Sequence, residues 1–105
     1  MTQKEKQERA DEKLKRFRNL TERMALLYEN KNADYGDSFG DTYRRLGLCS
    51  AVGRILDKCN RICNLAVNKG GQQIKDESIQ DNLIDLANYA IMTLIELDEE
   101  ETENQ

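Results

Sequence analysis

The chain has 105 residues, of which 38% are hydrophobic and 34% charged, and it contains neither proline nor histidine. This length allows one domain with a modest core, and a composition rich in good helix formers predicts an all-α protein. The formal net charge of -4 makes nucleic acid an unlikely partner, since that ligand requires a basic face, and the lack of histidine excludes catalytic pairs and triads that use it.

The N-terminal residues 1–13 are polar and of mixed charge, which predicts an extension that is either disordered or helical. They lack the apolar centre of a signal peptide, and no apolar run approaches the roughly 20 residues of a membrane span. We therefore expect a cytoplasmic protein without a membrane partner. From Leu14 onward one apolar face predicts a core-packing helix to about Asn32; its members are Leu14, Phe17, Leu20, Met24, Leu27 and Tyr28.

The segment NADYGDSFGD, residues 32–41, should interrupt the helices, because it is rich in Asn, Asp and Gly. Its aromatic residues have two interpretations. Tyr35 and Phe39 either pin the loop to the core, which is the favoured alternative, or Tyr35 stacks on a nucleobase while Asp34 or Ser38 binds a sugar or a metal. A short helix, TYRRLG, should follow, with Asp41 or Ser38 as its cap.

A helix is predicted from about Ser50, its suggested cap, to Asn68. Its apolar side includes Cys59 and Cys63, and its opposite side carries Arg54, Asp57, Lys58 and Arg61. The three cysteines, with Cys49, should be reduced. Cys59 and Cys63 could form half of a metal site, but the chain has no histidine to complete it. We therefore expect them to be ordinary core cysteines.

After a loop around Gly70 and Gly71, a long helix is predicted from Asp76 to Leu97, capped by Ser78 or Asp76. The single helical domain would thus span residues 14–97, and the acidic tail, residues 98–105, should fray. One stripe of this last helix carries acids and an amide at spacings of four, four and three, namely Glu77, Asp81, Asp85 and Asn88.

The two long helices should pack antiparallel because a short loop joins them. Arg54, Lys58 and Arg61 would then meet Asp81 and Asp85. Two outcomes remain open, with even odds on spacing alone: a pocket in which basic residues bind phosphate and carboxylates hold Mg²⁺, or salt bridges without a ligand. The last helix also carries more apolar surface than a small bundle covers, which predicts a homo-oligomer.

Three segments in order, NKNADYGDSF, RILDKCNRICNL and DESIQDNLIDLANYAIM, resemble the nucleotide modification associated domain 1 family of small, mostly phage-borne proteins. The resemblance covers about Leu27 to Leu97. That family is in turn similar to the MazG-like all-α nucleotide pyrophosphatases, which are dimers or tetramers. Those enzymes hold Mg²⁺ with four acids and cleave a nucleoside triphosphate to monophosphate and pyrophosphate; Glu77 and Asp81 match the outer positions of their EExxD motif.

The chain departs from the enzyme pattern, because Ser78 replaces the second glutamate and the turn with Asp57, Lys58 and Arg61 replaces the ExxE motif. The resemblance therefore implies nucleotide binding rather than hydrolysis, in nucleotide metabolism, base modification or sequestration of signalling nucleotides in a phage-infected host. The alternatives are a Mg²⁺-dependent pyrophosphohydrolase and a non-catalytic assembly protein. The expected ligand-binding residues are Lys58 and Arg61 for phosphate, Asp34 and Tyr35 for the base, and Arg54, Asp57 and Asn88 beside them. The expected metal ligands are Glu77, Asp81 and Asp85, of which Asp81 and Asp85 could instead bind the ribose hydroxyls.

Overall fold

The computed structural model describes residues 1–68 and 78–104, and this part of the chain forms helices without any strand. The helices are α1 (Gln3–Tyr35), α2 (Ser38–Leu46), α3 (Leu48–Val67) and α4 (Ile79–Glu103). The prediction of a small all-α protein of about four helices is thereby confirmed. The chain divides into two compact units, Met1–Gly36 and Asp37–Gln105, and each is described by itself.

The N-terminal unit is the helix α1, which is continuous through the polar residues at its start. Thr2 and Glu5 form a capping box, in which the Glu5 backbone N–H donates to Thr2 Oγ1 over 3.1 Å and the Thr2 N–H donates to Glu5 Oε1 over 3.2 Å. The helix ends at Tyr35, three residues later than the sequence predicted. Gly36 ends it with φ of 69°, a conformation that costs glycine little because it has no Cβ.

Helix α2 opens the second unit and begins earlier than expected. Asp37 caps it, with the Gly40 N–H donating to Asp37 Oδ1 over 3.2 Å, so the prediction of Ser38 or Asp41 as the cap was wrong. Gly47, with φ of 80°, separates α2 from α3. Ser50 does not cap α3 as predicted, because it lies inside the first turn and donates its hydroxyl to the Gly47 carbonyl over 2.8 Å.

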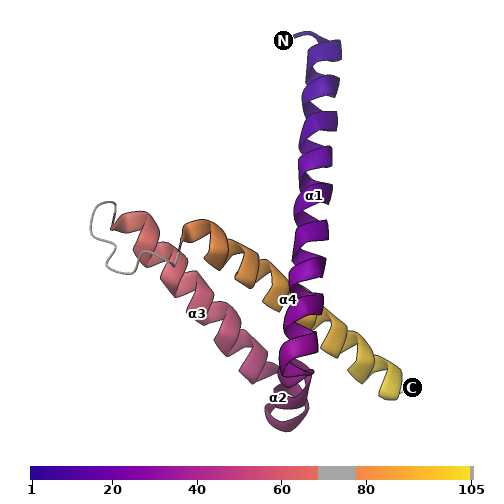
Figure 1. Ribbon diagram of the computed structural model, residues 1–105, viewed down its shortest axis with the longest axis vertical. Coiled ribbons are helices and arrows are strands. Elements are labelled where there is room, and N and C mark those ends of the chain that lie inside the picture. The colour runs from indigo at the N-terminus through magenta and orange to yellow at the C-terminus, as the bar shows by residue number, and fades with distance from the viewer. Residues whose placement is uncertain (69–77, 105) are drawn as a thin grey trace. The chain divides into compact units, whose positions relative to one another are not determined.

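Helices α3 and α4 run antiparallel along each other as a hairpin, and α2 contacts both (Figure 1). The predicted cap of α4 is confirmed at Ser78, whose hydroxyl accepts from the Asp81 N–H over 3.0 Å. The predicted fraying after Leu97 was wrong, since α4 continues to Glu103. The reason is an anchor outside the helix: the Tyr43 hydroxyl of α2 donates to Glu100 Oε2 over 3.1 Å.

The interior of this unit lies where α2 covers the hairpin. Tyr43 and Ala51 are each only 1% exposed there, and Thr93 and Glu96 are also buried. Asn82, in the first turn of α4, is likewise only 1% exposed. A polar interior of this kind requires hydrogen-bond and charge partners, which α2 supplies in part. No helix within the described residues is long and apolar enough to cross a membrane.

Candidate functional site

The candidate site is the charged face of the α3–α4 hairpin, and two contacts fix its register. Lys58 Nζ lies 3.0 Å from Asp85 Oδ2. The guanidinium carbon of Arg54 lies 5.9 Å from the centre of the Tyr89 ring. The two contacts are one helical turn apart on each helix and in opposite directions along the chain, as antiparallel packing requires.

Helical periodicity then determines which residues share this face. An α-helix turns by about 100° per residue. All charged residues in the ranges 48–67 and 79–97 therefore lie on one side of the plane that contains the two helix axes, either on the charged face or near the contact between the helices. Because α3 and α4 are antiparallel, residues that are turned in the same direction away from the helix–helix contact lie on the same face of the hairpin. The predicted meeting of the two stripes is confirmed for Lys58 and Asp85, which form an ion pair. Helical spacing places Arg54, Arg61 and Asp81 on the same face, together with Asp57.

The Lys58–Asp85 pair forms the centre of the charged face. Its side chains are only 14% and 28% exposed, so the two charges attract each other more strongly than at a fully solvated surface. The ammonium group donates to the carboxylate over 3.0 Å. An anionic ligand that reaches Lys58 must compete with Asp85, whereas a cation at Asp85 must compete with Lys58.

An aromatic pair borders the Lys58–Asp85 pair one turn farther along α4. Tyr89 stacks on Phe39 of α2, with ring centres 5.9 Å apart and ring planes 23° from parallel. Phe39 thus pins the start of α2 to the hairpin, as the favoured interpretation of the loop aromatics predicted. That interpretation placed Phe39 in a loop, whereas the structure places it in a helix. Sequence reasoning did not include Tyr89 in the site; its signal was a spacing of four residues from Asp85.

The remaining predicted site residues have different outcomes. Asp57 and Asp81 are exposed, and Asn88 is half-buried at the edge of the charged face. Glu77 lies outside the described residues. Asp34 and Tyr35 form the exposed last turn of α1 in the N-terminal unit, so their assignment to the site stays a prediction.

A complete protein cage for a metal is not formed by the part of the chain that the structure describes, where no group of three or more Cys, Asp or Glu side chains could hold a metal ion. Asp81 and Asp85 nevertheless fit Mg²⁺ chemically, because this ion commonly takes one or two carboxylates together with waters and ligand phosphates. The prediction of core cysteines was wrong for Cys49 and Cys63, which are exposed, while Cys59 is half-buried. The outer side of α3, which was expected to be covered, is open at these positions.

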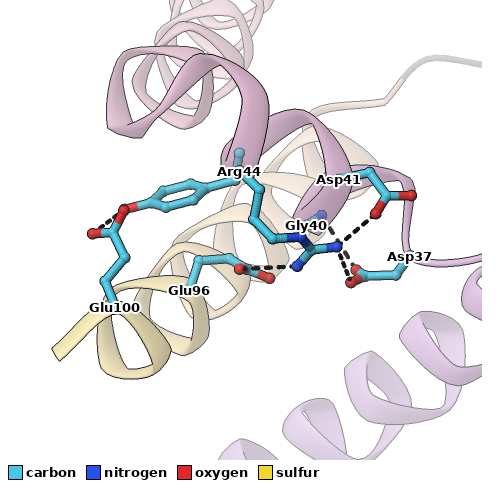
Figure 2. Close-up of polar contacts among 7 residues, drawn as sticks. Asp37, Gly40, Asp41, Arg44, Glu96 and Glu100 are labelled. Carbon is cyan, nitrogen blue, oxygen red and sulfur yellow. Dashed lines mark hydrogen bonds and ion pairs between the residues drawn. The ribbon is translucent and has the colours of Figure 1, made fainter. Parts of the chain in front are cut away.

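A second polar cluster joins α2 to α4 (Figure 2). Arg44 Nη2 lies 2.6 Å from Asp41 Oδ1 and 3.3 Å from Asp37 Oδ2, and Arg44 Nη1 lies 3.7 Å from Glu96 Oε2. Sequence reasoning missed this cluster, because its partners on α2 and α4 are more than fifty residues apart. One guanidinium with three carboxylates stabilises the capped start of α2 against the end of the hairpin.

The electrostatics of this cluster follow from burial and from its excess of acids. Burial raises the pKa of Glu96 above its usual value, as do the negative charges of Glu99, Asp37 and Glu100, while Arg44 opposes the shift. Burial also raises the pKa of Tyr43, as does its hydrogen bond to Glu100. The contacts between α2 and α4 account for both pKa shifts without a bound ligand.

Asn82 is the most deeply buried polar side chain of α4. Its amide donates to the Ser78 carbonyl over 2.8 Å, which ties the side chain to the helix start. Its Oδ1 atom is buried and accepts no hydrogen bond from residues 1–68 or 78–104. A buried acceptor without a hydrogen bond lowers the stability of the fold by about 1–3 kcal/mol. Asn82 lies about one helical turn before Asp85 on α4.

Comparison with known protein families identifies the chain. The model of the family called nucleotide modification associated domain 1 matches residues 31–97, well over half of the chain, so this protein belongs to that family. The matched region includes α2, α3, the charged face and most of α4. No curated protein and no solved structure matches the chain.

Proposed function

We propose, from its membership in this family and from the charged face, that the protein binds a nucleotide on the α3–α4 hairpin. The observation that carries the proposal is the half-buried Lys58–Asp85 pair, placed one turn from the Arg54–Tyr89 contact. A phosphate group and a planar base are the two parts of a nucleotide, and a cationic side chain beside an aromatic ring offers a contact for each.

In this proposal Lys58 and Arg61 bind the phosphates and Arg54 lies between the phosphate and base regions. Lysine binds phosphate as a point charge, while the arginine fork can bind two oxygens at once. Asp57 and Asn88 are proposed to bind the polar edge of the ligand. A protein that binds without cleaving would act by sequestering its nucleotide.

Asp81 and Asp85 have a separate proposed role, which is to hold Mg²⁺ together with the ligand phosphates, with Glu77 as a further proposed ligand. When bound, the ion supplies positive charge that offsets the repulsion between carboxylate and phosphate. Without the ion, Asp85 instead repels a phosphate at Lys58. The sign of the effect of Asp85 on binding therefore reports whether the ion takes part.

A thermal-shift and calorimetric screen over nucleoside mono-, di- and triphosphates and cyclic dinucleotides tests the proposal, with and without Mg²⁺. A ligand at 100 times its dissociation constant should stabilise the fold by about 2.7 kcal/mol. Lys58→Met should weaken binding at least tenfold. Arg16→Met is the matched control, because Arg16 forms an exposed ion pair with Glu12 on α1, outside the hairpin, and it should leave affinity unchanged.

Asp85→Asn is the more informative variant, since the two ways of binding predict opposite results. If Mg²⁺ bridges Asp85 and the phosphate, affinity falls in Mg²⁺ and rises in EDTA; if Lys58 acts alone, affinity rises in both. Measuring pyrophosphate release in the same samples detects hydrolysis. A screen in which no nucleotide binds would contradict the proposal and favour the assembly protein considered in the sequence analysis.

A further inference from the structure

The aromatic pair of Phe39 and Tyr89 joins the start of α2 to the middle of α4. Its ring centres lie 5.9 Å apart, with the ring planes 23° from parallel. The guanidinium carbon of Arg54 on α3 lies 5.9 Å from the centre of the Tyr89 ring. Two nearly parallel rings with an arginine beside them suit a nucleobase, because a base stacks both on aromatic side chains and on a guanidinium plane.

Helix α2 does not depend on this aromatic pair for its position, because it has two other attachments to α4. The Tyr43 hydroxyl donates to Glu100 Oε2 over 3.1 Å, and Tyr43 itself is only 1% exposed. Arg44 Nη1 lies 3.7 Å from Glu96 Oε2 (Figure 2). Both attachments lie in the second half of α2, more than one helical turn after Phe39. The Phe39 ring can therefore move away from its partner ring while α2 stays attached to α4.

The aromatic pair also lies at a suitable distance from the Lys58–Asp85 pair. Tyr89 follows Asp85 by four residues on α4, and Arg54 precedes Lys58 by four residues on α3. Four residues of an α-helix rise about 6 Å, which is comparable with the length of the ribose that separates a base from its phosphate. A base at the rings therefore leaves its phosphate near Lys58, the residue that binds phosphate in the proposed function.

We propose that the base of the nucleotide is held between the rings of Phe39 and Tyr89, and that the ligand is a purine nucleotide. This inference rests on the proposed function, because it assigns the base of the same ligand. Stacked bases are about 3.4 Å apart, so a base between two rings holds the ring centres about 6.8 Å apart. The observed 5.9 Å must therefore widen by roughly 1 Å. A purine has two fused rings and covers more of both side chains than a pyrimidine does, which strengthens the stacking.

Calorimetry with ATP, GTP, CTP, UTP and inorganic tripolyphosphate tests the inference. The unmodified protein should bind the two purine nucleotides about fivefold more tightly than the two pyrimidine nucleotides. Phe39→Leu should weaken ATP binding about tenfold, because it removes one stacking surface, and should leave tripolyphosphate binding unchanged. Tyr89→Phe keeps the ring and should retain the affinity for ATP. Phe17→Leu is the matched control, since it makes the same change at the other phenylalanine of the chain, on α1, and it should leave both affinities unchanged.

Phe39→Trp provides a second readout, because the chain contains no other tryptophan and its indole fluorescence reports this position alone. Saturating ATP should quench that fluorescence, whereas tripolyphosphate should not. Circular dichroism establishes that the variants keep their helices. Unchanged fluorescence with ATP bound, or equal losses of ATP and tripolyphosphate affinity in Phe39→Leu, would overturn the inference and leave the proposed function standing. An unmodified protein that binds no nucleotide at all would contradict the proposed function as well.

Discussion

The Lys58–Asp85 pair supports a quantitative prediction, because its geometry and burial are both defined. We consider a double-mutant cycle with Lys58→Met, Asp85→Asn and the double variant. At the observed separation of 3.0 Å, Coulomb attraction at an effective dielectric constant of about 20 amounts to about 5.5 kcal/mol. The cost of partly desolvating two charges offsets most of this attraction.

Two limits bracket the expected result. Exposed ion pairs couple by about 0.2–1 kcal/mol, whereas breaking a buried pair costs about 3–5 kcal/mol. Side chains that are 14% and 28% exposed lie between these limits, and we expect a coupling energy of about 1–2 kcal/mol in the free energy of unfolding. Each 1 kcal/mol corresponds to about 4–8 °C in melting temperature for a domain of 60–100 residues.

Urea denaturation at neutral pH and low salt measures the cycle, with the exposed Arg16–Glu12 pair of α1 as the control. That control is an i, i+4 pair on one helix and should couple by about 0.3–0.5 kcal/mol. The reasoning would be refuted by a coupling at Lys58 and Asp85 no larger than the control, because the pair would then be solvated and would not fix the register of α3 and α4.

Three further predictions concern the junction between α2 and α4. Because the pKa of Glu96 is raised, the folded protein binds its proton more tightly than the unfolded chain does, so stability falls as pH rises from the ordinary glutamate pKa through the raised value. Glu96→Gln should flatten that part of the pH dependence in urea titrations and should not destabilise the protein at pH 7. Tyr43→Phe removes the hydrogen bond to Glu100 and should lower the melting temperature by several degrees and speed amide exchange in the last turn of α4. Asp37→Ala removes the cap of α2 and should cost about 1 kcal/mol in the free energy of unfolding, with Asp37→Ser as the conservative control.

Local patterns predicted the helices and the charged face because both depend on spacing within one helix. Lys58 and Asp85 were predicted to meet from two periodic stripes and a short connection, and they do meet. The predicted helix ends were less accurate where a side chain from another helix determines the end. Glu100 is held by Tyr43, 57 residues away in the chain, so α4 extends beyond the predicted end.

The Arg44 cluster could not be predicted for the same reason. Its four members come from α2 and α4, and neither helix alone shows a pattern that requires the other. The capping role of Asp37 was obscured by two neighbouring residues with equal capping tendency, Ser38 and Asp41. Only the contact of Asp37 with both Gly40 and Arg44 distinguishes it.

The most direct test of nucleotide binding on the charged face is a residue-resolved map of chemical-shift changes on adding a nucleotide. The changes should be concentrated at Arg54, Lys58, Asp85 and Tyr89, with Val52 and Leu94 on the opposite face unaffected. A saturating nucleotide that shifts the signals of another surface, while those four residues remain unchanged, would contradict it.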